Sequence, residues 1–357
     1  MHESNTARLD SLDALRGLDM LIILGVDALV YCIYAECGGN GFWRLAREQL
    51  GHAPWEGLRV YDCVFPLFVF IAGVSMCFSQ LRQAGKPAAR VLGKLWRRAI
   101  VLVLLGLLVN GAITWEPGQM RYASVLGLIG LSGALAGSFT LFSHGKMLPG
   151  LALAALILGG VGAAQHLGGN YTPSGCFNAK VDALLCPGIL HSGSYDPEGP
   201  LCIVSATALS LLGCCAGRLF LLVERAWLRG IVLMASGGLL LACGWFLPCI
   251  KGIWTPGFVL CCAGIGAISL GGLHLVIDVL RWRAWSLPLR VVGMNALAAY
   301  MVVHLVSFSA IAQRLLGGTW ALFLSPGAQR IATAATALLL VWWLCWFLYR
   351  KRAFIKL

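Results

Sequence analysis

Long apolar stretches alternate with short polar segments along the whole chain. A helix that crosses the hydrocarbon core of a bilayer needs about 20 mostly apolar residues, and ten stretches are long enough. They cover approximately residues 17–35, 62–81, 99–115, 122–142, 147–165, 200–222, 230–248, 256–278, 290–312 and 331–349. The pattern therefore predicts an all-α fold, a polytopic membrane helix bundle of about ten transmembrane helices, which forms one domain over residues 1–357.

The composition excludes other classes of protein. Of the 357 residues, 59% are hydrophobic and only 12% are charged, whereas soluble domains carry about 25% charged residues. A chain of this kind cannot cover a soluble particle with polar groups, and it is too apolar to be disordered. The expected surroundings are therefore the lipid bilayer, and a cytosolic globular enzyme is excluded.

The net charge of +12 is distributed unevenly. If the chain alternates across the membrane from a cytoplasmic N-terminus, 19 of the 27 Lys and Arg residues fall on the cytoplasmic side and 8 outside. Cytoplasmic loops are rich in Lys and Arg, so we expect both termini in the cytoplasm. The basic charge then reflects orientation, and we expect no nucleic-acid partner. The first 17 residues lack a basic n-region, which favours a retained first helix over a cleaved signal peptide.

Two long segments are expected outside, at about 36–61 and 165–199. Both contain aromatic residues among turn-forming Gly, Pro and Asn, and long loops of this kind are often functional. We expect both segments to fold over the outer mouth of the bundle. Cys176 and Cys186 lie in the second segment, where a disulfide between them is one possibility.

Several ionisable side chains lie where lipid is expected. Asp19 and Asp27 are eight residues apart in the first span and hence near one helix face; they fit either a polar helix contact or the lining of a water-filled path. Arg16 stands three residues from both Asp13 and Asp19, which allows a structural clamp or a contact to an anionic ligand. Asn295 lies among small residues, where a hydrogen bond between helices is the default expectation.

A histidine and an aspartate begin and end the segment HAPWEGLRVYD. Asp62 could simply cap the second span, and His52 could be structural. Together they could also form a catalytic pair, since a carboxylate can hold an imidazole in one tautomer while the other ring nitrogen takes a proton. The 14 cysteines include no CxxC pair with a histidine partner, so we expect no metal site.

These patterns leave three classes of function open. The protein could be a transporter in which acids and histidines relay protons, an intramembrane enzyme, or a structural protein. No short helices interrupted by Gly or Pro recur in matching halves, which disfavours an inverted-repeat transporter. The acid, histidine and aromatic residues on one outside loop favour ligand binding or chemistry there.

Five motifs resemble one known family, and together they extend over nearly the whole chain. They are RLDSLDALRG at 8–17, HAPWEGLRVYDCVFPLFVF at 52–70, YDPEG at 195–199, KGIWTPGFVL at 251–260 and GMNALAAY at 293–300. The sequence resembles the heparan-alpha-glucosaminide N-acetyltransferase family, in its minimal bacterial form. These are polytopic membrane enzymes that use cytoplasmic acetyl-CoA to acetylate a terminal glucosamine on the far side of the membrane.

The resemblance implies roles for particular residues. His52 takes the place of the family's active-site histidine, and Asp62 that of its nearby acid. Asp27 replaces an amide of the family pattern, which affects the expected substrate contacts. The candidate substrate-binding residues are Asp27, Trp55, Tyr195, Asp196, Glu198 and Asn295, and the candidate contacts to acetyl-CoA are Arg16 and Arg121.

The resemblance also implies the setting and leaves alternatives. We expect an acetyltransferase of a bacterial inner membrane, with acetyl-CoA as the acyl donor, an amino sugar or glycan as the acceptor, and a homodimer as a possible assembly. His52 acts either as general base or as acetyl carrier. An O-acyltransferase of a cell-wall or surface glycan and a sugar or ion transporter remain as alternatives.

Overall fold

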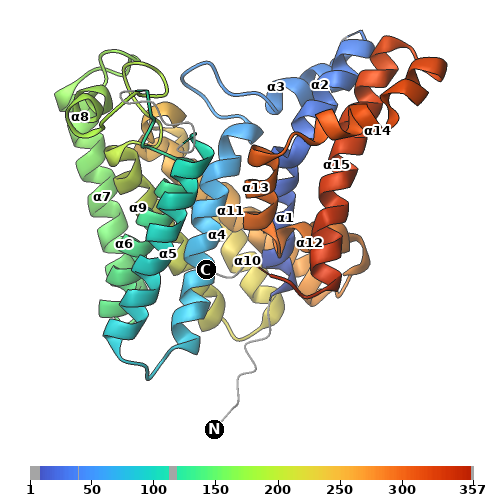
Figure 1. Ribbon diagram of the computed structural model, residues 1–357. Coiled ribbons are helices and arrows are strands. Elements are labelled where there is room, and N and C mark those ends of the chain that lie inside the picture. The colour runs from blue at the N-terminus through green and yellow to red at the C-terminus, as the bar shows by residue number, and fades with distance from the viewer. Residues whose placement is uncertain (1–8, 39, 112–118, 355–357) are drawn as a thin grey trace.

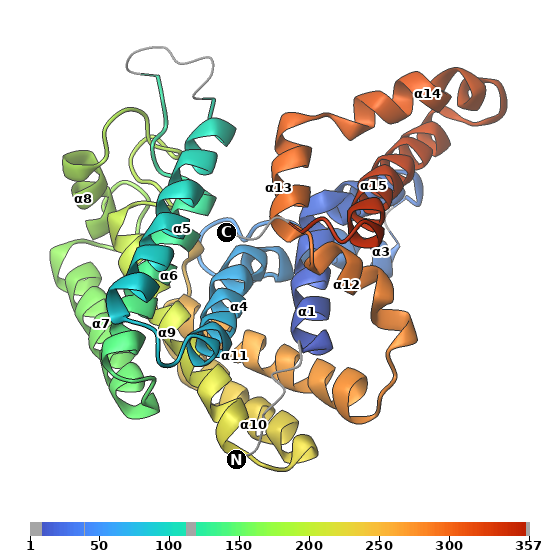
Figure 2. The same cartoon turned by 60° about the horizontal axis from the view of Figure 1, so that its bottom comes forward.

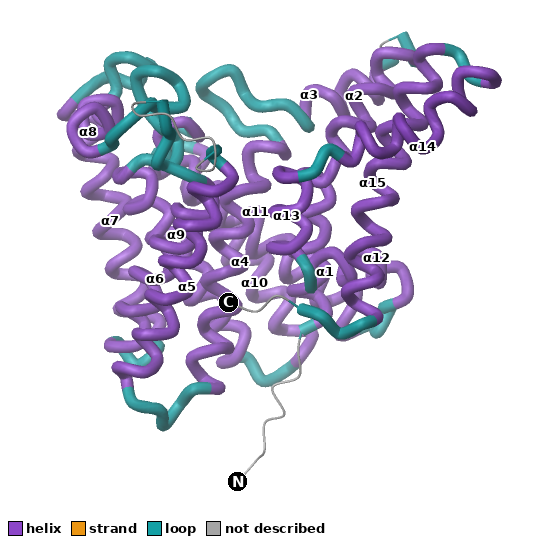
Figure 3. The backbone as a smooth tube through the Cα atoms, in the orientation of Figure 1, coloured by secondary structure: helices purple, strands orange, loops and turns teal. Residues whose placement is uncertain are grey.

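The computed structural model describes residues 9–38, 40–111 and 119–354. In these ranges the chain forms helices and loops, with no strand beyond two isolated bridging pairs. Figure 3 shows helices through the whole body and loops gathered at its two ends. The all-α membrane bundle expected from the apolar pattern is thus confirmed.

The helices follow the apolar stretches closely. The α-helices are α1 (Asp10–Leu21), α2 (Asp27–Glu36), α3 (Gly41–Gln49), α4 (Val60–Arg82), α5 (Ala88–Val109), α6 (Val125–Phe142), α7 (Met147–Gly168), α8 (Phe177–Leu185), α9 (Pro200–Leu222), α10 (Ala226–Trp245), α11 (Pro256–Leu273), α12 (Leu287–Gly293), α13 (Ala296–Leu305), α14 (Phe308–Phe323) and α15 (Pro326–Arg350). Short π-helical turns follow α1 at Ile22–Val26 and α11 at His274–Val279, and Lys251–Ile253 is a 3-10 turn.

Eight helices in the described ranges are long and apolar enough to cross a membrane, and a ninth candidate is the pair formed by residues 284–293 and 296–305, which is bent by 61°. The expected span at 99–115 differs from the structure, because its helix α5 already begins at Ala88. The apolar pattern missed this start since Lys94, Arg97 and Arg98 lie inside the helix. In Figure 1, α5 nevertheless runs alongside α6.

Helix α4 lies between two groups of helices. Figure 2 shows α5 to α9 on one side of it and α1, α12, α13 and α15 on the other. The largest core cluster includes Phe70 of α4, Leu209 and Leu211 of α9 and Phe258 of α11, each no more than 1% exposed. The buried face of α9 therefore connects α4 with α11 in the centre of the bundle.

The two ends of the bundle differ. Helix α1 begins and α15 ends at the lower end of Figure 1, which we call the inner end. The predicted loops 36–61 and 165–199 lie at the opposite, outer end, where they include α3 and α8. Helices α2, α3 and α14 project there beside the first half of α15. The first described helix thus begins, and the last one ends, at the same end of the bundle.

Two backbone features shape the first span. Gly25 adopts φ +131° within the π-helical turn, a conformation that favours glycine, so the span bends just before Asp27. Lower down, Gly17 touches α12 so closely that a Cβ there would overlap the carbonyl oxygen of Leu289. A Cβ on Gly293 would likewise overlap the carbonyl oxygen of Asp13. Helices α1 and α12 thus pack backbone to backbone.

Candidate active site

His52 and Asp62 meet at the outer end of the bundle. Nδ1 of His52 lies 2.8 Å from Oδ1 of Asp62, and the two side chains are 56% and 1% exposed, respectively. A carboxylate in this position accepts the Nδ1–H hydrogen, which leaves Nε2 as the basic nitrogen. Nε2 has no hydrogen-bond partner among the described residues. The pair predicted from spacing is therefore formed, with a buried acid and an accessible imidazole.

The backbone around Asp62 fixes its orientation. Its Oδ2 accepts hydrogen bonds from the backbone N–H groups of Ala53, at 3.0 Å, and Arg59, at 3.2 Å. The second bond closes the first turn of α4, so the capping role also considered for Asp62 is real. Arg59 in turn donates from Nη1 to the carbonyl oxygen of His52 at 2.8 Å. The hydrogen bonds by which Asp62 caps α4 therefore also hold its carboxylate in the position that orients the His52 imidazole.

Lys251 joins this pair from a distant part of the sequence. Its Nζ lies 3.1 Å from Nδ1 of His52 and 3.4 Å from Oδ1 of Asp62. Burial lowers the pKa of Lys251, and the nearby Asp62 carboxylate opposes that shift. The sequence analysis counted Lys251 only as an outside basic residue in KGIWTPGFVL. The motif around Lys251 and its expected place on an outer loop were signals in the sequence. Spacing could not show the contact, because Lys251 and His52 are 199 positions apart.

Backbone contacts between two loops place Lys251 beside His52. Glu56 forms an antiparallel bridge with Ile250, and the N–H of Gly57 donates to the carbonyl oxygen of Cys249 at 2.8 Å. Gly57 has φ +121°, which its lack of a side chain permits. The loop before α4 and the turn before α11 are thus joined directly at the site.

Aromatic residues at the outer end make edge contacts with one another and with His52. Nε1 of Trp55 donates to the carbonyl oxygen of Tyr171 at 2.6 Å, and its ring lies edge-on to Tyr195 with centroids 5.4 Å apart. Tyr61 makes an edge contact with His52, and its hydroxyl donates to Asp27 at 3.2 Å. Of the predicted substrate contacts, Asp27 is therefore linked to His52 through Tyr61, whereas Trp55 and Tyr195 contact each other.

Arg121 holds two further predicted residues. Its Nε and Nη2 donate to the two oxygens of Asp196 at 2.7 and 2.6 Å, and Nη2 also pairs with Glu198. Asp196 is fully buried and Glu198 is 8% exposed. Burial outweighs the attraction of Arg121 and raises the pKa of Glu198 to about 7. The pKa of Asp196 is lowered because hydrogen bonds from Arg121 and the backbone exceed the effect of burial.

This charged cluster adjoins the histidine. Burial lowers the pKa of His191, and positive charge on Arg121 and on His52 contributes to the shift. His191 also donates its backbone N–H to Asp196 at 3.1 Å. Arg121, predicted as a contact to acetyl-CoA, is thus occupied by two acids at the outer end, and its role toward a ligand stays a prediction.

Arg16 lies near the inner end. Its guanidinium donates to Asp13 at 2.9 Å and to the hydroxyl of Ser75 on α4 at 3.0 Å, so the expected clamp forms with Asp13. Asp19 is 2% exposed, and neither of its carboxylate oxygens has a hydrogen-bond partner within the described residues. The clamp therefore does not extend to Asp19.

Arg16 also lines a cavity of about 340 Å³ inside the bundle. Arg98 of α5 lines the same cavity, together with apolar residues of α4 and α6 and with Tyr300 of α13. Val125, another lining residue, starts α6 directly after the segment that carries Arg121. The cavity therefore extends from two arginines toward the outer charged cluster.

Asn295 lies apart from this network. It is 3% exposed in the break between α12 and α13, and its Nδ2 donates to the carbonyl oxygens of Val291, at 3.1 Å, and Cys345 of α15, at 3.3 Å. The helix contact expected from its small neighbours is therefore present. Its role toward a substrate stays a prediction.

The disulfide considered for Cys176 and Cys186 is absent, since both thiols are free. Cys176 caps the start of α8 and Cys186 its end. A helix rises about 1.5 Å per residue, so this separation exceeds the reach of a disulfide. Spacing along the sequence did not reveal the helix between them. Within the described ranges, no three His, Cys, Asp or Glu side chains form a group suited to a metal ion.

Comparisons with known proteins bear on this site. Residues 8–173 match the family model described as the catalytic region of heparan-alpha-glucosaminide N-acetyltransferase. The human protein of that name is 25% identical over 98% of this chain and 60% of its own length. The mouse protein is 24% identical over 84% of this chain and 53% of its own length.

The chain thus spans little more than half the length of these curated relatives. The part matched by the family model includes His52, Asp62, Arg16 and Arg121, whereas Lys251 lies beyond it. The resemblance drawn from the motifs is confirmed to the extent that residues 8–173 match the model of this family and that both curated relatives bear its name.

Proposed function

We propose that this protein is a membrane acetyltransferase that moves the acetyl group of acetyl-CoA to the amine of a glucosamine-type sugar at the outer end. The observation that carries the proposal is the His52–Asp62 pair, in which a fully buried carboxylate orients a half-exposed imidazole. The family match of residues 8–173 supports the reaction class. The setting proposed from the resemblance is a bacterial inner membrane.

In the proposed reaction, the amine nitrogen attacks the thioester carbon, a C–N bond forms, and the C–S bond breaks. Nε2 of His52 takes the proton that the amine loses, and Asp62 stabilises the resulting imidazolium. The CoA thiolate leaves and takes up a proton from solvent, and the His52 imidazolium returns its proton to solvent, which restores the base. The products are the N-acetylated sugar and free CoA.

The cavity lined by Arg16 and Arg98 is the proposed donor site. Acetyl-CoA carries phosphate groups that require cationic partners, and the guanidinium groups of Arg16 and Arg98 both line this cavity. The remaining wall is mostly apolar, including Phe65, Phe68 and Leu126, and suits the pantetheine arm. In this arrangement the thioester points toward the outer end.

The acceptor is proposed to bind beneath the outer loops. Trp55 and Tyr195 offer flat apolar faces, on which the ring of a sugar can stack. Nε2 of His52 offers a base for the proton that a sugar amine loses on acetylation. The match of residues 8–173 to an N-acetyltransferase family favours N-acetylation of an amino sugar over O-acylation of a neutral glycan.

The decisive experiment measures release of free CoA from acetyl-CoA by purified protein with a panel of amino sugars and neutral glycans. We expect release with glucosamine-type acceptors and none with sugars that carry a hydroxyl in place of the amine. Release with only neutral glycans would indicate an O-acyltransferase. Uptake of sugar into vesicles without acetyl-CoA would instead indicate a transporter.

A second measurement separates direct transfer from an acetyl-histidine intermediate. Direct transfer is favoured because an acetyl-imidazole on a half-exposed side chain is open to hydrolysis. We therefore expect no radiolabelled acetyl group on the protein when acceptor is absent. Labelling that is lost in His52→Ala would establish the covalent route.

A further inference from the structure

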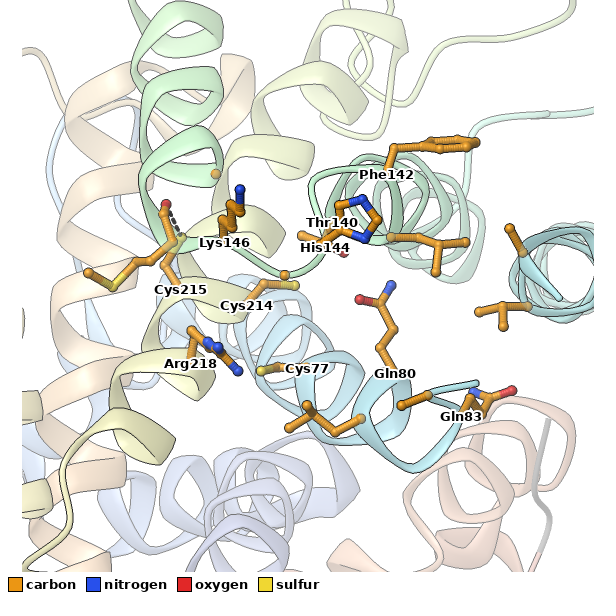
Figure 4. A pocket seen from close by; sticks show the side chains of 18 of the residues that line it. Cys77, Gln80, Gln83, Thr140, Phe142, His144, Lys146, Cys214, Cys215 and Arg218 are labelled. Carbon is orange, nitrogen blue, oxygen red and sulfur yellow. Dashed lines mark hydrogen bonds between the residues drawn. The ribbon is translucent and has the colours of Figure 1, made fainter. Parts of the chain in front are cut away.

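A second cavity lies at the inner end of the bundle, among α4, α5, α6, α7 and α9. Its volume is about 480 Å³, and it shares no lining residue with the proposed donor cavity. Figure 4 shows Gln80, His144, Lys146 and Arg218 around its space, with Cys77 and Cys214 beside Arg218. The proposed acetyl transfer leaves this cavity unused.

The charges that line this inner cavity have one sign. Lys86, Lys146 and Arg218 lie in its wall together with His144, and no Asp or Glu does. None of these three Lys and Arg side chains forms a hydrogen bond or ion pair with another described residue. Arg218 is only partly exposed. Lys86 and Lys146 are exposed, and three like charges around one cavity attract an anion into it.

Two helix starts add to the positive potential. Ala88 begins α5 and Met147 begins α7, and both residues line the cavity. Neither helix has a side chain that caps its first turn by a hydrogen bond. Free N–H groups at a helix start favour phosphate, so the backbone reinforces the preference set by the lysines and Arg218.

The surroundings of the cavity indicate which kind of anion. Phe142 and Leu81 line it yet are 65% and 41% exposed, and the neighbouring Leu148 is 76% exposed. These apolar side chains stand at the ends of membrane-spanning helices, next to the cations. A soluble anion gains nothing from such a rim, whereas the acyl chains of a lipid do. Basic clefts between helices on the cytoplasmic side suit anionic headgroups.

We propose that this inner cavity binds the phosphate headgroup of an anionic phospholipid from the leaflet at the inner end of the bundle. Lys146, at the start of α7, and Arg218 of α9 contact the phosphate, and the acyl chains lie along Leu81 and Phe142. The ligand chemistry is that of a phosphate group, and the exposed apolar rim assigns it to a lipid. The rule that cytoplasmic loops are rich in Lys and Arg accounts for basic loops at this end. It does not account for a cavity that these cations line.

The test uses the full-length protein, purified in detergent and stripped of lipid. Its thermal unfolding midpoint is measured with phosphatidylglycerol, with phosphatidylcholine, with inorganic phosphate and with acetyl-CoA. The pocket variant is Lys146→Gln/Arg218→Gln. The matched control is Arg225→Gln/Lys351→Gln, which removes two exposed cations from the same end but none from the cavity. Native mass spectrometry counts the phosphatidylglycerol molecules bound to each protein.

We expect phosphatidylglycerol to raise the wild-type midpoint by about 5 °C more than phosphatidylcholine. The pocket variant loses this difference and one bound lipid, while the control keeps both. Equal responses of the pocket and control variants would overturn the proposal. A full shift by inorganic phosphate alone would overturn the lipid as ligand, and displacement of the lipid by acetyl-CoA would assign the cavity to the donor.

If the double variant does not fold, Arg218→Lys takes its place, because it keeps the charge but loses the planar guanidinium. The expected result is a smaller stabilisation by phosphatidylglycerol, with the lipid still bound. A stabilisation by phosphatidylglycerol equal to that of the wild type would contradict a contact between the Arg218 guanidinium and the phosphate.

Discussion

The charged residues around the outer site and those around the inner cavity differ in how they are paired. At the outer end, Arg121 is paired with Asp196 and Glu198, and Lys251 lies beside Asp62. At the inner end, Lys86, Lys146 and Arg218 surround a cavity with no acid in its wall. Buried charges that form ion pairs fix the positions of their neighbours, whereas cations without an acidic partner can bind an anionic ligand. On the two proposals above, the outer end is preorganised around His52, and the inner cavity takes up an anion.

The largest expected effect comes from the outer histidine. His52→Ala should lower kcat for CoA release by about 10²–10⁴-fold, because the general base is lost. The amount and thermal stability of the protein should change little, since the His52 side chain is 56% exposed. The matched control is His166→Ala, which removes an exposed imidazole from the same end of the bundle. Comparable loss in both variants would contradict the assignment.

The second largest effect is expected from loss of the ion pairs of Arg121 with Asp196 and Glu198. Arg121→Met leaves Asp196 and Glu198 buried without their cation and should destabilise the protein by about 3–5 kcal/mol. The thermal unfolding midpoint should fall by about 5–10 °C. Arg330→Met is the control, because Arg330 pairs with Glu36 in an exposed position and such pairs contribute little. Similar midpoints for the two variants would show that the buried cluster is not stabilising.

A smaller effect on the reaction is expected from Lys251, which lies beside His52 and Asp62. Lys251→Met removes a positive charge next to Asp62, which keeps its hydrogen bonds from His52, Ala53 and Arg59. We expect kcat to fall about tenfold, which is less than for His52→Ala, since the base itself remains. Steady-state kinetics of CoA release give the result. A loss as large as that of His52→Ala would mean that Lys251 takes part directly in proton transfer.

The smallest expected effect is a pH dependence of stability. Burial raises the pKa of Glu198 to about 7 and that of Asp182 to about 6. Both groups therefore hold protons in the folded state that the unfolded chain releases at lower pH. The stability that these protons provide is complete below about pH 4, where the unfolded carboxyls are also protonated, and is lost as the pH rises through 6 and 7.

The midpoint of the wild type should accordingly fall by about 2–4 °C between pH 5 and pH 8. In Glu198→Gln the decline should be smaller. Glu48→Gln, which alters an exposed acid at the same end, should follow the wild type. Parallel curves for all three proteins would exclude Glu198 as a source of the dependence.

The sequence predicted the parts of this arrangement that depend on local order. Apolar length identified the bundle, and the spacing of His52 and Asp62 suggested their contact, because both flank one short loop. Lys251 could not be assigned, since its approach depends on the bridge between Glu56 and Ile250. The start of α5 was misplaced because its cations lie within the helix. The bridge between Cys176 and Cys186 was excluded by a helix that their spacing did not reveal.

The close contact between Gly17 and Gly293 has a consequence for genetic studies. Gly17 closes the motif RLDSLDALRG, yet its place in the structure is set by the carbonyl oxygen of Leu289 on α12. A larger residue at either glycine would force two helices apart and reduce the amount of protein that survives quality control in the membrane. Loss of acetylation in cells that carry such a variant would report abundance rather than turnover. The two causes separate only when the protein is quantified alongside its product.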